Sequence, residues 1–191
     1  MTGDYRFAGF DVSGSGAGFV AVNASGQLMA AEVWQSADPS ESARLRSLAA
    51  WTRHLAPKVD VDAIVSLSIE GPFDRGRSSR VLMWAQGAVM SNVFPERWTD
   101  NDWATYQPQR VKQTAALATG VATTARGAGK TAMGEAAQRH WPDVMEFFSE
   151  AIERSPWPID DYDKALGDLV DAAWVAETDR IAFMAMLDGG G

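Results

Sequence analysis

The order of strand and turn signals in the first 35 residues constrains the fold more than any other feature. The runs RFAGFDV at 6–12 and GFVAVNASGQLMAAEVW at 18–34 read as three short strands. A glycine-rich stretch at 14–18 joins the first two strands, and Asn-Ala-Ser-Gly at 23–26 forms a hairpin turn. Connections this short favour antiparallel pairing. The chain is therefore predicted to open with a three-stranded antiparallel meander.

The next two elements predict a change from antiparallel to parallel pairing. A helix is expected from Asp38, which stands in the N-cap position before Pro39 and Glu41, and leucines then recur along one side. The buried-type run VDAIVSLSIEG at 61–71 follows as a strand. Because a strand reached through a crossover helix lies most easily parallel to the first strand, we expect these two to pair.

The rest of the chain alternates helices with one more strand, which is typical of an α/β fold. We predict a single domain over residues 1–188, built on a mixed five-stranded sheet flanked by helices, and a flexible Gly tail at 189–191. The elements expected after residue 71 are a helix over 78–94, a strand within 102–108, helices at about 109–118 and 128–140, a short acidic helix within 141–160 and a long helix over 161–187.

Composition limits the chemistry that the side chains can supply. The 191 residues include no cysteine and only two histidines, so catalysis is expected to rest on carboxylates. No apolar run of 18 residues is present, and the N-terminus lacks the basic and apolar regions of a signal peptide. We therefore expect a cytoplasmic protein with no membrane partner.

The charge distribution points to a polyanion more than the total charge does. A net charge of −8 taken alone argues against nucleic acid. Residues 71–140, however, hold nine Lys or Arg against five Asp or Glu, a local balance of +4 that leaves −12 elsewhere. This asymmetry is compatible with a basic surface for phosphates, although an ordinary solvated face has the same signature.

Four acids have positions that favour a common site. Asp11 and Glu70 end the first strand and its expected parallel neighbour, so both emerge at the sheet edge where α/β folds place their sites. Asp168 and Asp171 are three residues apart on the last helix and share one face that can point there. Any one of them, taken singly, is more often a cap or a solvated turn residue. The set of four predicts a site more specifically than its members do.

Gathered carboxylates repel one another, and divalent cations such as Mg²⁺ are the usual compensation. Two ions about 3.5 to 4 Å apart can activate a water and stabilise both oxygens of a phosphodiester in line. The four acids therefore indicate hydrolysis of phosphodiester bonds.

The segment TARGAGKT at 124–131 resembles the end of a nucleotide-binding P-loop, but its context disagrees. Thr124 stands where the first glycine of the motif should be, and no buried strand precedes the segment. We interpret it as a Gly-rich turn that places Lys130 in the first turns of a helix, and we expect no nucleotide cofactor.

The acids and their surroundings resemble the RuvC family of Holliday junction resolvases, which has the RNase H-like fold. Four segments are similar in order and spacing: GFDVSGSGAGFVAV, IEGPFDRGRSSRVLMWAQGAVMSNV, YQPQRVKQTAALATGVATTARGAGK and DLVDAAWVAE. The first motif reads Asp-Val-Ser-Gly where the bacterial pattern is commonly Asp-Pro-Gly, and Gly-Pro separates Glu70 from Phe73. These departures and the small size suggest a phage-type member, at work in a bacterial or phage-infected cytosol.

The resemblance implies a role for individual residues. The four acids, here Asp11, Glu70, Asp168 and Asp171, hold two Mg²⁺ or Mn²⁺ ions in the family. The resemblance also implies that Phe73 packs against bases at the crossover, although a core position after a strand is the alternative.

Two lysines are implied to lie near the scissile phosphate, where an ammonium offsets charge that builds in the transition state: Lys112 and Lys130. A surface lysine is the alternative for Lys112. The residues expected to contact DNA are Phe73, Arg75, Arg77, Arg80, Arg110, Lys112, Arg126 and Lys130.

A four-way junction has near two-fold symmetry, so two symmetric nicks call for a homodimer. In the helix over 78–94, Trp84 recurs at helical spacing with smaller apolar residues. Together with Met83 and Met90 it gives this helix more large apolar side chains than a small core needs. These large side chains are either an interface or ordinary core.

The function expected from these residues is that of a metal-dependent, structure-selective DNA endonuclease that resolves four-way or other branched junctions. One alternative is a junction-binding architectural protein that has lost cleavage, against which the four acids weigh. Another is an actin-like nucleotide phosphotransferase, which shares the opening strand with its Asp and Gly turn but normally needs two such domains.

Overall fold

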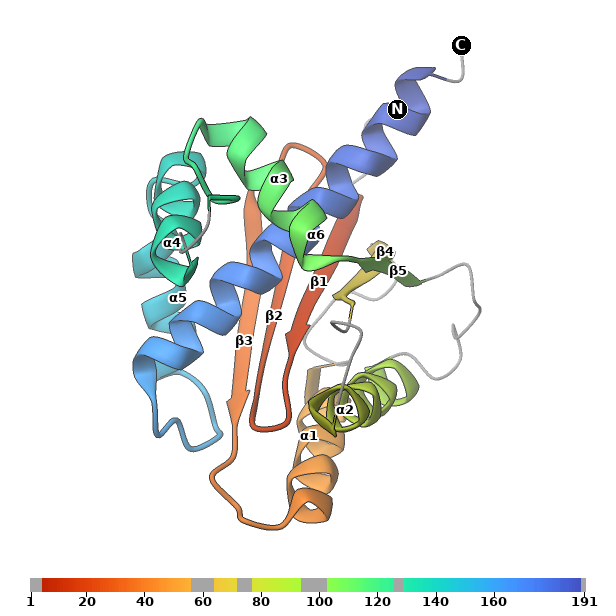
Figure 1. The fold of residues 1–191 in the computed structure, drawn as a ribbon, viewed down its shortest axis with the longest axis vertical. Helices are drawn as coiled ribbons and strands as arrows, with labels where there is room; N and C mark the ends of the chain where they lie inside the picture. The colour runs from red at the N-terminus through yellow and green to blue at the C-terminus, as the bar shows by residue number, and fades with distance from the viewer. Residues whose placement is uncertain (1–4, 56–63, 72–76, 94–102, 126–128, 190–191) are drawn as a thin grey trace.

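The computed structural model describes residues 5–55, 64–71, 77–93, 103–125 and 129–189, and of residues 77–79 only the backbone. Five strands form one sheet in the order β3-β2-β1-β4-β5, which confirms the mixed five-stranded α/β sheet (Figure 1). The elements are β1 Arg6–Val12, β2 Gly16–Asn23, β3 Leu28–Gln35, α1 Glu41–Leu55, β4 Ile64–Glu70, α2 Arg77–Val93, β5 Trp103–Tyr106, α3 Pro108–Thr119, α4 Gly129–His140, α5 Val144–Glu153 and α6 Tyr162–Gly189.

The opening meander is antiparallel, as predicted. β1 pairs with β2, and β2 pairs with β3. Asn23 closes the hairpin between β2 and β3, because its side-chain oxygen accepts hydrogen bonds from the backbone N–H groups of Ser25 and Gln27. Gly26 supplies the left-handed conformation that this turn needs, with φ of 82°.

The other half of the sheet is parallel, which confirms the crossover prediction. β4 pairs in parallel with β1 on one side and with β5 on the other. The carboxyl ends of β1, β4 and β5 therefore meet at one edge of the sheet, as they do at ligand-binding edges of α/β folds. Of these strand ends, β1 and β4 carry the two predicted acids.

Helices cover both faces of the sheet. α6 lies diagonally across one face, with α3, α4 and α5 beside it (Figure 1), and it shares one hydrophobic core with them and the sheet. α1 and α2 pack on the other face and form a second core with it. None of the helices in the described part of the chain is long and apolar enough to cross a membrane.

Two glycines allow α6 to lie directly against the strands. A Cβ built at Gly9 in β1 would collide with the backbone oxygen of Ala172, and one at Gly18 in β2 would collide with the backbone of Asp168. Any side chain at these positions would push the helix away from the sheet. The small residues therefore set the distance between α6 and the strand ends, and with it the geometry of the site.

Two helix boundaries differ from the sequence prediction. The cap of α1 is Ser40 and not Asp38, because the Ser40 hydroxyl accepts from the N–H of Ala43 and its carbonyl from that of Arg44. Asp38 instead accepts a hydrogen bond from the N–H of Ser40 in the preceding turn. At the other end of the chain, α6 includes Gly189, and the remainder of the expected Gly tail at 190–191 lies outside the described residues.

Candidate active site

The alternation of side chains along the strands sends both strand-end acids to the face that α6 covers. In β1, Phe7 belongs to the core on the α6 side, whereas Ala8 and Phe10 belong to the opposite core. Asp11 has the same parity as Phe7 and therefore faces α6. In β4, Ile69 belongs to the opposite core, so Glu70 also faces α6.

The end of β4 is held firmly where Glu70 leaves the sheet. The side-chain amide of Gln86 in α2 donates a 2.6 Å hydrogen bond to the carbonyl oxygen of Glu70. The N–H of the next residue, Gly71, donates to the carbonyl oxygen of Tyr106 at the end of β5 at 2.7 Å. The backbone is therefore fixed on both sides, and the carboxylate is presented from an anchored strand end.

Helix α6 brings its two acids to Asp11 through the close approach at Gly18. Asp11 pairs with Gly18 across β1 and β2, and Gly18 touches the backbone of Asp168 on α6. Asp168 is 4% exposed, and Asp171 follows one turn later on the same face. The structure thus brings together the four acids that the sequence analysis singled out.

Two predicted lysines reach the same place from different helices. The Nζ of Lys130, in the first turn of α4, lies 3.7 Å from Oδ1 of Asp168. Lys112 comes from the middle of α3. A cavity of about 210 Å³ runs between these helices and the acids, and the residues that line it are Glu70, Pro108, Val111, Lys112, Gly129, Lys130, Met133 and Asp171.

Burial and mutual repulsion raise the pKa of three of these carboxylates. Burial, followed by the charges of Asp171, Asp168 and Glu70, holds the pKa of Asp11 well above its ordinary value, and Lys130 opposes the shift. Burial and the Asp171 charge raise the pKa of Glu70 to about 7, against Lys112 and Lys130. Burial raises the pKa of Asp171 to about 6, with Lys130 opposing and Asp168 adding to the shift. The cluster holds more negative charge than its lysines compensate.

The donor set suits a hard divalent cation in its chemistry. Carboxylate oxygens are the ligands that Mg²⁺ prefers. Burial, and after it mutual repulsion, raises the pKa of these acids, and a bound cation would offset both effects. Within the described ranges, however, no three His, Asp or Glu side chains are grouped closely enough to hold an ion as they stand.

A third lysine at the site was missed by the sequence analysis. Lys164, in the first turn of α6, donates a 3.0 Å hydrogen bond from Nζ to Oδ2 of Asp168. The signal was present in the sequence, since Lys164 lies four residues before Asp168 and the two share a helix face. Such i,i+4 pairs are common on solvated helices, and the spacing alone does not distinguish a buried one.

The predicted DNA contacts are placed in part. Arg110 is exposed on α3, on a different face from Lys112, and it lines a separate cavity with Thr114 and Leu117. Arg80 is exposed on α2, and its guanidinium carbon lies 5.0 Å from the centre of the Trp84 ring. The other residues of that prediction, Phe73, Arg75, Arg126 and the side chain of Arg77, lie outside the described part of the structure.

The helical spacing of apolar residues in α2 wrongly placed Trp84 on the buried face. Ala85 and Val89 are buried, as expected for the face toward the sheet. Trp84, grouped with them on helical spacing, is instead 48% exposed, and Met83 is 53% exposed. The core alternative is therefore wrong for Met83 and Trp84, whereas Met90 is partly buried.

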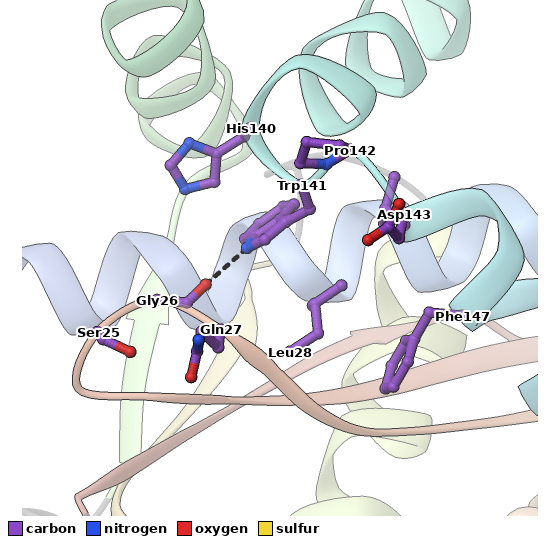
Figure 2. A pocket seen from close by; sticks show the side chains of 10 residues that line it. Ser25, Gly26, Gln27, Leu28, His140, Trp141, Pro142, Asp143 and Phe147 are labelled. Atoms are coloured by element: carbon purple, nitrogen blue, oxygen red, sulfur yellow. Dashed lines mark hydrogen bonds between the residues drawn. The ribbon is translucent and has the colours of Figure 1, made fainter.

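A larger cavity, of about 500 Å³, opens at the opposite end of the sheet (Figure 2). It lies between the β2–β3 turn and the α4–α5 connection, where Trp141 donates a 2.6 Å hydrogen bond from its indole nitrogen to the carbonyl oxygen of Gly26. None of the predicted site residues lines it. Cavity size alone would therefore have pointed away from the acids.

Comparison with solved structures identifies the fold. The chain is similar to RuvC from Thermus thermophilus in complex with a Holliday junction substrate, with a TM-score of 0.59 and 19% sequence identity over 94% of this chain and 96% of that one. A second Thermus thermophilus RuvC structure gives a TM-score of 0.56 and 18% identity over the same shares.

Sequence comparison adds no relative: no protein-family model matches the chain, and no curated protein matches it significantly. At this level of identity, similarity in structure speaks for the fold alone. The RNase H-like sheet expected from the sequence resemblance is confirmed, and the chain has the fold of the RuvC Holliday junction resolvases.

Proposed function

We propose that this protein is a divalent-metal-dependent endonuclease that cuts four-way or other branched DNA junctions. The observation that carries the proposal is the convergence of Asp11, Glu70 and the two acids of α6 at one sheet edge, with Lys112 and Lys130 beside them. The fold adds support, because one of the similar RuvC structures is a complex with a Holliday junction substrate.

The chemistry proposed is hydrolysis of a phosphodiester, in which water adds to phosphorus and one P–O ester bond breaks. Two Mg²⁺ or Mn²⁺ ions held by the four carboxylates would supply the activated water and the charge stabilisation for this step. The residues of the chain orient the reactants around it. Lys112 and Lys130 lie on the cavity side of Glu70 and Asp171, where their ammonium groups can bind the phosphate oxygens and offset charge in the transition state.

DNA contact is expected on the side of the molecule that carries these lysines. Lys112 and the largely exposed Lys130 supply this cationic surface. Arg110, two residues before Lys112 on α3, faces another way and lines a separate cavity. A protein of net charge −8 must confine its phosphate contacts to such a patch. Affinity for DNA should therefore fall steeply with added salt. A flat salt response would remove this surface from the proposal.

We further propose that the protein acts as a homodimer, because two symmetric nicks in a junction require two sites. The exposed Met83 and Trp84 on α2 are the candidate contact. Large apolar side chains of this kind are enriched at interfaces. Trp84→Ala should shift the sedimentation equilibrium of the metal-free protein toward monomer, whereas Leu117→Ala, at an exposed apolar residue of α3, should leave it unchanged.

A panel of labelled substrates tests the proposal. Four-way junction, flap and linear duplex are incubated with Mg²⁺, Mn²⁺ or Ca²⁺ and resolved on one gel, beside Asp11→Asn and the control Glu150→Gln, an exposed acid on α5. We expect Mg²⁺ and Mn²⁺ to support cutting of the junction by wild type and the control but not by Asp11→Asn. An uncut junction would contradict the proposal.

The same gel separates the alternatives. Junction binding in Ca²⁺ without any cutting in Mg²⁺ would favour an architectural junction binder. Equal cutting of duplex and junction would favour a nuclease without structure selectivity. Hydrolysis of ATP, measured in parallel, would revive the nucleotide phosphotransferase, which the single sheet and the absence of a second such domain among the described residues do not favour.

A further inference from the structure

The carboxylate of Asp168 already has a cation on each oxygen. Lys164 donates from Nζ to Oδ2 at 3.0 Å, and Nζ of Lys130 lies 3.7 Å from Oδ1. The two lysines are not equivalent, because the side chain of Lys164 is 30% exposed and that of Lys130 is 63% exposed. Water screens the outer pair more strongly. Lys164 is therefore the principal partner of Asp168 in the absence of metal.

The position of the Lys164 ammonium is built into the fold. It occupies the space where Gly16, the first residue of β2, has no side chain, since a Cβ built there would collide with Nζ of Lys164. The Gly16 Cβ would also crowd Oδ2 of Asp168. The glycine thus leaves a niche at the strand end that the lysine fills, next to the acid it binds.

The backbone that carries Lys164 is anchored as well. Asp161 caps α6 by accepting a hydrogen bond from the N–H of Lys164 at 2.9 Å. Buried Gln35, the last residue of β3, accepts from the N–H groups of Asp160 and Asp161 and donates to the carbonyl oxygen of Asp161 at 2.7 Å. These bonds hold the first turn of α6 against the sheet, so the lysine is held in place at both ends.

Resting on the proposed function, we propose that Lys164 is a positioning residue that serves as the counter-cation of Asp168 in the metal-free protein and competes with the divalent ion for it. Oδ2 of Asp168 accepts a hydrogen bond from the Lys164 ammonium, which leaves fewer of the carboxylate's lone pairs free for a metal. A divalent ion and the ammonium also repel each other at this carboxylate, so metal binding favours departure of the ammonium from the Gly16 niche. Lys164 lowers the affinity for metal and stabilises the cluster while no metal is bound.

Mn²⁺ binding without DNA tests this proposal through a readout other than cleavage. Isothermal titration measures the dissociation constant for wild type, Lys164→Met and Lys164→Gln. Lys164→Met removes a partly buried positive charge from beside the ion, so it should tighten Mn²⁺ binding roughly tenfold. It should also lower the melting midpoint of the metal-free protein. Lys164→Gln removes the charge but keeps a donor to Asp168, so it should tighten binding in the same direction by less.

Two controls separate this effect from general electrostatics. Arg154→Met removes one positive charge from an exposed ion pair with Glu150 on α5, and it should leave Mn²⁺ affinity within about twofold of wild type because exposed charges are screened. Asp11→Asn should abolish the titrated site, which shows that the heat comes from the acid cluster.

Weaker or unchanged Mn²⁺ binding by both Lys164→Met and Lys164→Gln, with wild type binding normally, would overturn the role of Lys164 and leave the proposed nuclease intact. If wild type itself bound no Mn²⁺, both proposals would fail together. If Lys164→Met does not fold, Lys164→Gln alone decides the question, because it keeps a polar donor beside Asp168 without the charge.

Discussion

Helix α6 carries two groups of charged residues whose surroundings shift their pKa values in opposite directions. Near its start, Asp168 and Asp171 join Asp11 and Glu70, and burial and mutual repulsion raise the pKa of three of the four. Two turns further on, Glu177 is fully buried, yet its pKa is lowered, because hydrogen bonds and charges from Arg180 and His140 outweigh burial. We call the first group the acid cluster and the second the Glu177 cluster.

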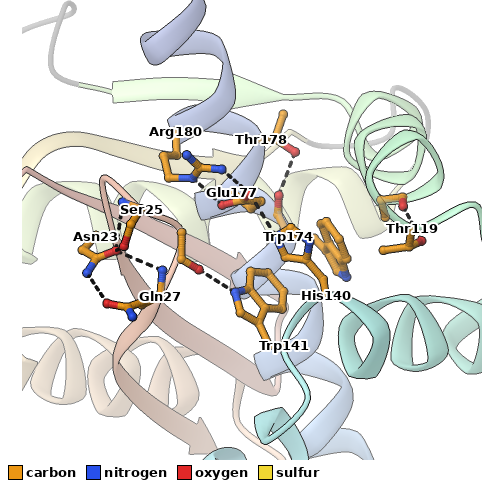
Figure 3. Close-up of polar contacts among 12 residues, drawn as sticks. Asn23, Ser25, Gln27, Thr119, His140, Trp141, Trp174, Glu177, Thr178 and Arg180 are labelled. Carbon is orange, nitrogen blue, oxygen red and sulfur yellow. Dashed lines mark hydrogen bonds and ion pairs between the residues drawn. The ribbon is translucent and has the colours of Figure 1, made fainter.

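The Glu177 cluster is fully compensated (Figure 3). Arg180 donates to both carboxylate oxygens of Glu177, at 2.7 and 2.6 Å, and His140 contributes a third contact at 3.1 Å. Arg180 also donates to the carbonyl oxygen of Ala24 in the β2–β3 turn. The cluster therefore ties α4, α6 and the turn together at the end of the sheet opposite the acid cluster.

The contrast separates a buried charge that its neighbours compensate from buried charges that they leave uncompensated. A buried acid that is paired with a bidentate arginine and a histidine has its charge compensated within the protein, and its carboxylate oxygens are not available to a ligand. Acids that raise one another's pKa lower the stability of the empty protein and persist where a ligand compensates them. One helix carries both, so a sequence rich in acids on a helix says little until the partners of each are known.

Neutralising an acid in the acid cluster should have the largest effect, and on activity. Asp11→Asn keeps the shape of the side chain but removes its charge from the centre of the four acids. We expect single-turnover cleavage of a four-way junction in Mg²⁺ to slow by at least about a thousandfold, as for a residue that acts within a catalytic unit. Cleavage within tenfold of wild type would remove Asp11 from the chemistry.

The matching change in the Glu177 cluster should act on stability instead. Glu177→Gln leaves Arg180 as an uncompensated charge that is largely buried, so we expect a loss of about 3 kcal/mol in the free energy of unfolding, measured with urea. Glu135→Gln, which removes an exposed ion pair with Arg139, is the control and should cost less than about 1 kcal/mol. Cleavage by folded Glu177→Gln should remain near wild type.

The two clusters also predict opposite responses to pH in the metal-free protein. Glu70, with a pKa of about 7, and Asp171, with a pKa of about 6, bind protons in the folded state that the unfolded state has already released. The free energy of unfolding should therefore fall as pH rises from 5 to 8, by at least about 1 kcal/mol. Glu177 has a lowered pKa, so its contribution is present above pH 4.5 and is lost as pH falls further.

Urea unfolding in EDTA at several pH values measures this profile, and it should pass through a maximum near pH 5. Saturating Mn²⁺ should flatten the decline on the alkaline side, because a bound cation favours the ionised carboxylates. A stability that rises from pH 5 to pH 8 without metal would contradict the assignment of the raised pKa values to the acid cluster.

A third acid on α6 lies between these extremes and should give the smallest effect. Asp179 is buried, which raises its pKa, and its partners are the hydroxyl groups of Ser66 and Tyr106, with the Tyr106 hydroxyl at 2.9 Å. Tyr106→Phe removes one of these two donors and should lower the free energy of unfolding by about 1 kcal/mol. A loss as large as that of Glu177→Gln would show that Asp179 is ionised and depends on this bond.

Local patterns predicted the sheet well because the sequence patterns of strands and turns extend over only a few consecutive residues. The alternation in β1, the Asn-Ala-Ser-Gly hairpin and the run that became β4 were each read correctly, and Asp11 and Glu70 followed from their places at strand ends. The α6 acids came from their spacing on one face. The start of α1 was two residues off, because Asp38 and Ser40 are both good caps and only the turn geometry decides between them.

What depends on contacts between distant segments could not be predicted. His140 and Glu177 lie 37 residues apart in sequence, and no local pattern links them. Lys164 looked like any helical lysine until the niche at Gly16 placed its ammonium beside Asp168. Trp84 had the spacing of a buried residue, because periodicity marks a face and not its depth.

The central claim is that the acid cluster is under-compensated and made for a divalent cation. The most direct test compares the melting midpoints of wild type and Asp11→Asn at pH 8, in EDTA and in saturating Mn²⁺. The account predicts that Asp11→Asn melts higher than wild type in EDTA, because one repelling charge is gone, and gains little from Mn²⁺, whereas wild type gains several degrees. A variant that melts lower than wild type in EDTA, or that Mn²⁺ stabilises as strongly as wild type, would contradict the claim.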